Sequence, residues 1–156
     1  MRVQDAMTSN PKACSASTNL AAAAELMWTK DCGILPVVDD AGKVTGIVTD
    51  RDLLIALGTR NVRPSELTVG EVMMTPVVTC RASDDVDSAL SQMEARQIRR
   101  LPVVSEDGAL VGMLTMNDIV LHSNGKGKGT AVAYDHVMAT LKGICDHGQL
   151  SQLQPS

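Results

Sequence analysis

The sequence consists largely of one pattern used twice. Residues 46–52 read "GIVTDRD" and residues 112–118 read "GMLTMND", and each segment follows an "LPVV" motif. The prolines of these motifs, Pro36 and Pro102, lie 66 residues apart, and this single offset aligns the two halves without a gap. A repeat of this length is one structural unit used twice, and neither copy is large enough to bury its apolar face alone. The chain is therefore expected to fold as two small units that share a core.

Each copy predicts the same order of elements. In the first copy, apolar residues at helical spacing predict a helix over 20–27. The apolar runs 34–38 and 44–48, joined by a polar turn, predict a β-hairpin, and the helical period returns over 50–57. With a short first strand, the order is strand, helix, strand, strand, helix, and the second copy repeats it. The fold class is therefore α+β, with a small sheet and two helices in each unit.

The repeat also sets the domain organisation. The predicted parts are a first unit at residues 1–57, a linker at 58–66, a second unit at 67–122, and a tail at 123–156. Thr68 and Glu71, which have the spacing of a capping box, predict a short helical start to the second unit.

The tail begins with a stretch rich in glycine and lysine, "HSNGKGKGT", which is predicted to be a flexible connector. It does not fit a phosphate-binding P-loop, because no Ser or Thr directly follows a Gly-Lys pair. An amphipathic C-terminal helix is predicted to follow. The residues expected to share its apolar face are Tyr134, Val137, Met138, Leu141 and Cys145. This face is expected to pack on the rest of the chain or on a partner chain.

Composition argues against several classes of function. Trp28 and Tyr134 are the only aromatic residues, whereas single-stranded nucleic-acid binding usually needs aromatic stacking platforms. The net charge of −4 also disfavours a broad surface for phosphate backbones. No apolar run approaches the roughly 20 residues that cross a bilayer, and the N-terminus lacks the apolar core of a signal peptide. We therefore expect a cytoplasmic protein that binds neither nucleic acid nor membrane.

The cysteines and histidines predict neither a metal site nor a catalytic site. The four cysteines are scattered without a C-x-x-C pair, at Cys14, Cys32, Cys80 and Cys145. The three histidines fall in or near the tail without the short spacing of metal ligands, at His122, His136 and His147. We expect reduced, buried thiols and solvated or capping histidines. No nucleophile or paired-carboxylate signature points to an enzyme, and no cofactor is expected.

Taken together, these motifs resemble a tandem pair of CBS domains, a family named for cystathionine β-synthase. The resemblance rests on V-x-[DE]-x-M at the start of each copy, on "LPVV", on the paired glycines, and on G-h-h-T-x-x-D, where h is apolar. It covers residues 1 to about 122. It implies two units packed about a pseudo-two-fold axis, with clefts between them that bind AMP, ADP, ATP or S-adenosylmethionine. It also implies a regulatory role, and the tail helix resembles extensions of small stand-alone members.

The repeated Thr-x-x-Asp would suit such a ligand. Thr49 and Thr115 stand where a strand ends and a helix begins, and the free N–H groups of a helix N-terminus suit a phosphate. Asp52 and Asp118, three residues later, offer two acceptor oxygens to the adjacent hydroxyls of a ribose. The same spacing is also a capping box, in which the Asp side chain accepts from the N-cap backbone N–H. Both interpretations stay open, and they can coexist.

Adenine needs an apolar slot and a few backbone polar groups. The resemblance implies that the backbone at Ile34 and Arg100, two residues before the prolines, faces the base. Because Pro36 and Pro102 supply no N–H, a neighbouring position of the strand ladder is expected to be free for a ligand.

The remaining candidates close the slot or carry positive charge. Ala13 and Thr79, in the first strands, are expected to close the slot. Arg51, Arg99 and Arg100 are candidates to neutralise phosphates, although each is equally compatible with a solvated surface position. The copies differ here, since "TDRD" in the first corresponds to "TMND" in the second. The two clefts are therefore expected to differ in ligand or affinity.

The sequence thus predicts a non-catalytic regulatory protein that senses an adenine nucleotide and signals to a partner protein of unknown identity. A homodimer is expected, because a module this small leaves apolar helical faces to be buried. The alternative is a structural or stress-related dimer whose clefts are unoccupied, or which holds a metal through cysteines and histidines. An enzyme acting on a nucleotide is the third class.

Overall fold

The structure of the chain is a computed structural model that describes residues 1–125 and 131–146. It contains two compact units, which we name the α2 unit and the α4 unit after one helix of each. The α2 unit comprises Asn10–Thr79 and Val104–Val111, and the α4 unit comprises Met1–Ser9, Cys80–Val103 and Gly112–Ser156. Each unit contains segments of both sequence copies, so the domain bounds expected from the repeat stay a prediction.

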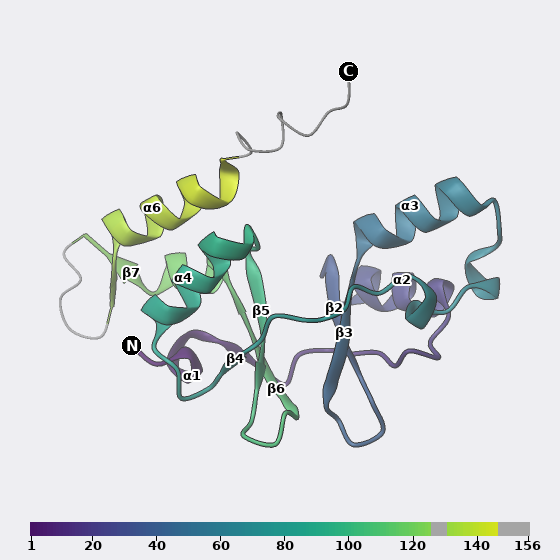
Figure 1. Cartoon of the computed structure of the whole chain (residues 1–156), viewed down its shortest axis with the longest axis horizontal. Coiled ribbons are helices and arrows are strands. Elements are labelled where there is room, and N and C mark those ends of the chain that lie inside the picture. The colour runs from purple at the N-terminus through teal and green to yellow at the C-terminus, as the bar shows by residue number, and fades with distance from the viewer. Residues whose placement is uncertain (126–130, 147–156) are drawn as a thin grey trace. The chain divides into compact units, whose positions relative to one another are not determined.

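The α2 unit combines a two-stranded antiparallel sheet with two helices (Figure 1). Its elements are α2 (Leu20–Thr29), β2 (Ile34–Val38), β3 (Val44–Thr49), α3 (Asp50–Arg60) and two short 3-10 helices, η1 (Pro64–Glu66) and η2 (Val69–Glu71). The predicted hairpin is confirmed, since Leu35 of β2 pairs with Val48 of β3. Its turn is fixed by Asp39, whose Oδ1 accepts from the backbone N–H groups of Ala41 and Lys43, each at 2.9 Å.

The hairpin and both helices of the α2 unit meet in one apolar core. Leu35, Val37 and Val48 of the hairpin are fully buried. Leu20 of α2 and Leu53 of α3 pack in the same cluster. This core fixes where β3 ends and α3 begins, which is where the first of the two predicted sites lies.

The α4 unit contains a four-stranded sheet in the order β1-β6-β5-β4. Its elements are α1 (Val3–Ala6), β1 (Thr8–Ser9), β4 (Cys80–Arg81), α4 (Val86–Arg96), most of β5 (Arg100–Val104) and of β6 (Leu110–Thr115), α5 (Met116–Leu121), β7 (Ser123–Asn124), β8 (Val132–Ala133) and α6 (Tyr134–Cys145). α6 is the expected C-terminal helix, and it lies against α4 (Figure 1). The α+β class is confirmed.

Each copy contributes its opening segment to the unit that carries the other copy. α1 belongs to the α4 unit, and η2 belongs to the α2 unit. This exchange explains the glycine at the start of each repeated motif. A Cβ on Gly46 would lie 2.5 Å from the Sδ of Met73, and a Cβ on Gly112 would collide with the Sδ of Met7. The glycines leave room for a methionine of one copy to pack on a strand of the other.

The buried face of α6 differs from the predicted one. Val137, Thr140 and Ile144 are buried. Tyr134 and Met138, which were expected to be covered, are 56% and 53% exposed, and Cys145 is exposed as well.

A glycine accounts for this difference. A Cβ on Gly143 would lie 2.6 Å from the Cγ of Glu94 in α4, so the glycine side of α6 is the side that approaches α4. The predicted face therefore does not pack on α4, apart from Val137, and its packing on a partner chain stays a prediction. The helix has two apolar sides, and apolar spacing alone does not show which of them contacts α4.

The predicted capping box at the start of the second copy is confirmed. The Oε2 of Glu71 accepts from the backbone N–H and the Oγ1 of Thr68, at 2.8 and 2.9 Å. None of the helices in the described part of the chain is both long and apolar enough to span a bilayer.

Candidate functional site

The first candidate site is the turn from β3 into α3. Thr49 is the N-cap of α3, and its Oγ1 accepts from the backbone N–H of Asp52 at 3.2 Å. In return, the Oδ2 of Asp52 accepts from the backbone N–H of Thr49 at 2.8 Å and from its hydroxyl at 2.7 Å. The capping-box interpretation is therefore confirmed for the first copy.

The second candidate site, where β6 turns into α5, has the same geometry. Thr115 donates to the Oδ2 of Asp118 through its N–H at 2.8 Å and through its hydroxyl at 2.7 Å. Within the described residues, the Oδ1 of neither Asp52 nor Asp118 has a hydrogen-bond partner. Both carboxylates are half-buried. Each turn thus presents one acceptor oxygen that the cap does not use.

In the α2 unit, the hairpin brings several predicted ligand residues to the Thr49 turn. Ile34 pairs directly with Thr49 across β2 and β3. The segment that contains Ala13 runs beside β2, because the N–H of Cys14 donates to the carbonyl oxygen of Pro36 at 3.0 Å. Ala13 and Ile34 are both half-buried, as an apolar slot would require. Arg51, which directly follows Asp50 at the start of α3, is exposed.

The α4 unit places its candidates less uniformly. Arg100 begins β5 with its side chain exposed, and Pro102 lies buried in the same strand. The guanidinium of Arg99 donates to the Sγ of Cys145 at 3.7 Å, so it lies at the end of α6. Thr79 belongs to the α2 unit. Its contribution to a site with Thr115 stays a prediction.

The thiols and histidines have structural surroundings. Burial raises the pKa of the Cys14 thiol to about 11. Burial, with the negative charge of Asp84 nearby, raises the pKa of Cys80 to about 12. His122 lies 2.7 Å from the carbonyl oxygen of Asp118 through its Nδ1, near the end of α5, while His147 lies outside the described residues. Across residues 1–125 and 131–146, no group of three or more His, Cys, Asp or Glu side chains could hold a metal ion.

A cavity of about 410 Å³ in the α2 unit was not anticipated from the sequence. It is lined from α2 by Trp28 and from α3 by Leu53, with the carboxylates of Asp31 and Asp50. It includes none of the predicted ligand residues. The sequence signal that could have indicated it is the contrast between Asp50 in the first copy and Met116 at the corresponding position of the second.

Comparison with known proteins identifies the architecture. The sequence model of the CBS domain matches twice, over residues 3–59 and 69–125. The chain belongs to the CBS domain family. The two matches cover both copies of the repeat, so the predicted tandem CBS pair is confirmed.

Curated relatives include one that the match covers over most of its length and others that it covers only in part. Hypoxic response protein 1 of Mycobacterium tuberculosis is 34% identical over 119 residues, which is 76% of this chain and 82% of that protein. An uncharacterized protein of Methanopyrus kandleri, MK0525, is 35% identical over 88 residues, or 56% of this chain and 45% of the relative. A homoserine O-acetyltransferase of Methanocorpusculum labreanum is 36% identical over 121 residues, or 78% of this chain and 24% of the enzyme. The chain thus spans less than half the length of the last two.

Solved structures with the same fold include CBS pairs with bound ligands. Hypoxic Response Protein I, with two coordinated zinc ions, aligns with a TM-score of 0.73 and 32% identity over 80% of this chain and 100% of that one. The CBS pair of protein MJ0100, with 5′-methylthioadenosine and S-adenosyl-L-methionine, aligns with a TM-score of 0.70 and 28% identity. The alignment covers 78% of this chain and 94% of that one. CBSX2 in complex with AMP aligns with a TM-score of 0.67 and 32% identity, over 77% of this chain and 93% of that one.

Proposed function

We propose that this CBS protein is a regulatory module that binds an adenosine-containing nucleotide and passes its ligand state to a partner protein. The candidate ligands are AMP, ADP, ATP and S-adenosylmethionine. The observation that carries the proposal is the duplicated Thr–Asp turn, in which Asp52 and Asp118 each keep one oxygen outside the cap. Two similar CBS proteins, solved with AMP and with S-adenosyl-L-methionine, support the ligand class.

The two halves of the turn suit different parts of the ligand. The unused oxygen of Asp52 would accept from a ribose hydroxyl, because a carboxylate repels phosphate and attracts a hydroxyl donor. The hydroxyl of Thr49, at the N-terminus of α3, would turn from its carboxylate partner to a phosphate oxygen. Ile34, Pro36 and Ala13 would line the slot for adenine. Ligand binding then exchanges one bond of the cap for bonds to the nucleotide.

The second copy would bind with a different preference. Thr115 and Asp118 would repeat the roles of their counterparts, with Arg100 and Pro102 on the base side. Arg51, which is exposed at the helix start of the first copy, corresponds to the neutral Asn117 in the second. A more highly phosphorylated ligand is therefore expected at the first copy, with Arg51 as its counter-charge.

The module would act without catalysis, as a cytoplasmic homodimer. The homoserine O-acetyltransferase among its relatives is matched over 24% of its length, so the similarity does not cover that enzyme as a whole. The four cysteines are free thiols, as is typical of a reducing compartment. Exposed apolar side chains on helices of both units, among them Leu54, Leu121 and Met138, support burial in a dimer.

The test is titration calorimetry of Asp52→Ala and Asp118→Ala with AMP, beside thermal melts. Each substitution should weaken binding at its own site by about 1.5–3 kcal/mol, or roughly tenfold to over a hundredfold. Glu71→Ala is the matched control, because it removes a capping box of the same kind outside both candidate sites. It should lower the melting temperature and leave the AMP affinity unchanged. If both aspartates can be removed without a change in affinity, the repeated turn is only a helix cap.

A second candidate function is a structural or stress-related dimer that depends on a metal. The two zinc ions coordinated in the structure of Hypoxic Response Protein I support this candidate. A thermal-shift comparison separates the two, since a nucleotide at 100 times its dissociation constant should add about 2.7 kcal/mol of stability. Stabilisation by zinc but not by any adenosine ligand would favour the second candidate.

A further inference from the structure

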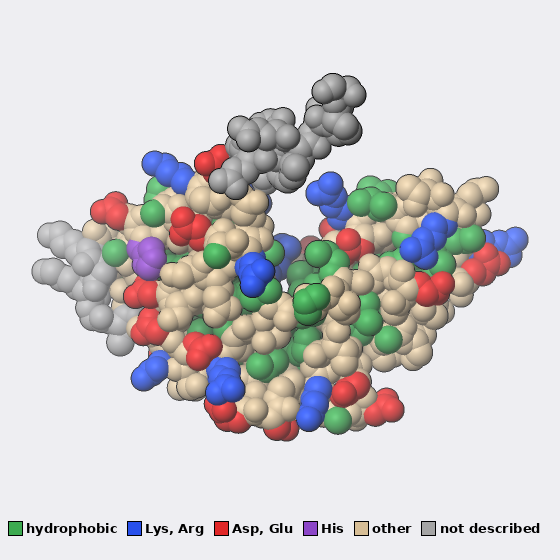
Figure 2. All heavy atoms as spheres, viewed as in Figure 1, with side chains coloured by type: hydrophobic (Ala, Val, Ile, Leu, Met, Phe, Trp, Pro, Cys, Tyr) green, Lys and Arg blue, Asp and Glu red, His purple; other side chains and the backbone are tan. Residues whose placement is uncertain are grey.

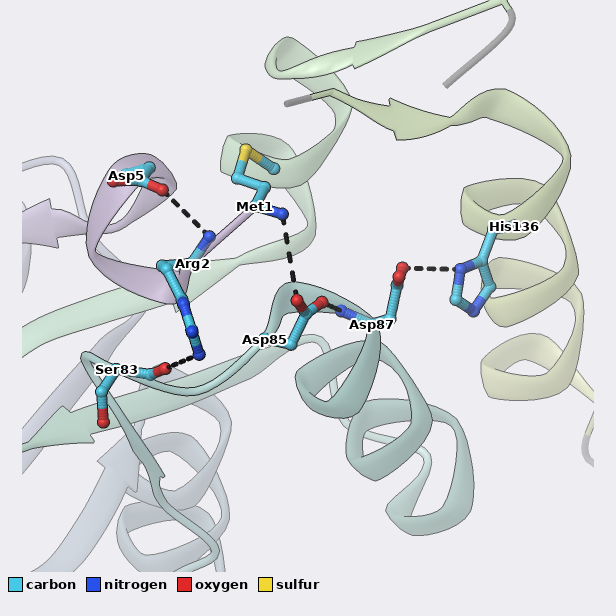
Figure 3. A network of polar contacts seen from close by, with 7 residues as sticks. All are labelled: Met1, Arg2, Asp5, Ser83, Asp85, Asp87 and His136. Carbon is cyan, nitrogen blue, oxygen red and sulfur yellow. Dashed lines mark hydrogen bonds and ion pairs between the residues drawn. The ribbon is translucent and has the colours of Figure 1, made fainter. Parts of the chain in front are cut away.

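In the α4 unit, α6 lies along α4 in the same direction. Near its start, His136 Nδ1 lies 2.9 Å from the Oδ1 of Asp87, in the first turn of α4 (Figure 3). Just after its end, the carbonyl oxygen of Asp146 accepts from the Nε2 of Gln97, which caps the end of α4, at 2.7 Å. The two helices are therefore parallel, with their C-terminal ends together.

Three of the positions that α6 and the residue after it contact, all near the C-terminal end of α4, have counterparts of interest in the first copy. Moving back by 66 residues, Glu94, Gln97 and Arg99 correspond to Trp28, Asp31 and Gly33. All three counterparts line the cavity of about 410 Å³ between α2 and α3. We call this cavity the α2–α3 groove. A helix fills the corresponding place in the α4 unit, whereas none of the elements in residues 1–125 and 131–146 fills the groove.

The surface around the groove is apolar and uncovered. Trp28 is 87% exposed and Leu54, on α3, is 71% exposed. Hydrophobic side chains are visible at the surface in the part of the molecule that carries α2 and α3 (Figure 2). Exposed apolar groups of this size around a cavity indicate a surface that another element covers.

α6 has a second apolar side suited to such a cover. Tyr134 and Met138 are exposed on it, Leu141 is half-buried, and the exposed Cys145 continues the stripe at helical spacing. Lys142 stands beside this stripe in the last turn, with its side chain exposed. The inner side of α6 packs on its own α4, so the outer stripe is free to contact another molecule.

The charges of the groove and of this stripe are complementary. Asp31 follows the end of α2 and Asp50 starts α3, and a Cβ on the adjacent Gly33 would lie 2.8 Å from the Oδ2 of Asp50. Within the described residues, no basic group pairs with either carboxylate. If a helix lies in the groove parallel to α2, as α6 lies parallel to α4, its C-terminal turn is beside Asp31 and Asp50. In α6, that turn carries Lys142.

From this correspondence, we infer that the α2–α3 groove binds the outer stripe of α6 from a second copy of this chain, with Lys142 of that copy facing Asp31 and Asp50. The inference deepens the proposed homodimer and rests on it. In a two-fold symmetric dimer the contact occurs twice, because each copy offers one groove and one α6.

The only tryptophan of the chain makes this contact measurable, because Trp28 lines the groove. Dilution of the protein should shift Trp28 emission to longer wavelength in step with the loss of dimer in light scattering. Lys142→Glu should raise the dimer dissociation constant roughly three- to thirtyfold, because two weak exposed ion pairs become repulsive contacts. Asp31→Lys added to Lys142→Glu should restore most of the affinity. Lys12→Glu makes the same charge change at an exposed position outside the groove and should have no effect.

The possible outcomes distinguish the groove contact from the homodimer and from AMP binding. If the protein is a dimer but Trp28 emission is independent of concentration and Lys142→Glu behaves like Lys12→Glu, the groove is not the interface. The homodimer then stands and the inference is wrong. A monomer at all micromolar concentrations overturns both. Neither result changes the calorimetric test of AMP binding, which the two aspartates decide.

Discussion

Thr140 provides a stringent test of how α6 packs in the α4 unit. Its side chain is completely buried on the inner side of the helix, and its Oγ1 has no hydrogen-bond partner among the described residues. A buried hydroxyl that loses its water without gaining a partner costs about 1–3 kcal/mol. Replacing Thr140 with Val removes the hydroxyl and keeps the branched shape.

The expected gain can be estimated from these terms. Thr and Val have similar helix propensities, so the hydroxyl dominates the difference between them. Thr140→Val should raise the free energy of unfolding by about 1–2 kcal/mol. In a chain of this length, each kcal/mol corresponds to about 2–4 °C in melting temperature. Urea unfolding followed by circular dichroism, beside calorimetric melts, measures both quantities.

Thr140→Ser is the matched control, because it keeps the hydroxyl and removes only a methyl group. It should lower the free energy of unfolding by roughly 1 kcal/mol. If Thr140→Val is neutral or destabilising while Thr140→Ser is tolerated, the hydroxyl has a partner. The packing described for α6 on α4 would then be incorrect.

Two further predictions concern packing and pH. Gly46→Ala and Gly112→Ala should each lower the free energy of unfolding by about 1–3 kcal/mol in urea titrations, because the new Cβ displaces a packed methionine. Gly58→Ala, within α3 and with open space around its Cβ position, should instead raise it by up to about 1 kcal/mol. Thermal melts should show that the melting temperature falls as pH rises from 9 towards 11. The pKa values of the Cys14 and Cys80 thiols are about 11 and 12 in the folded protein, against 9.0 in the unfolded chain, so the unfolded chain loses these protons first. Replacing both cysteines with Ala should reduce this slope, and an unchanged slope would contradict the assignment.

Much of the local structure could be predicted because its causes are local in the chain. The hairpin follows from two apolar runs around a turn, and Thr49 marks the start of α3 because its side chain caps that helix. The capping box of Thr68 and Glu71 was predicted for the same reason.

What could not be predicted depends on partners distant in the sequence. Periodicity shows that Gly46 lies in a strand, but not that Met73 of the other copy packs on it. Likewise, the inner side of α6 depends on Gly143 meeting Glu94, which apolar spacing does not reveal. The same distinction between local and distant causes applies to the candidate site. The Thr–Asp turns were predicted from spacing alone, whereas the position of Arg99 beside Cys145 depends on the packing of α6.

The proposed function depends on the repeated Thr–Asp turn binding the ribose of an adenosine nucleotide. A crystal structure of the protein with AMP would show whether it does. We expect a ribose hydroxyl within hydrogen-bonding distance, about 2.5–3.0 Å, of a carboxylate oxygen of Asp52 or Asp118. AMP bound with its ribose away from both aspartates, and with both caps intact, would contradict it.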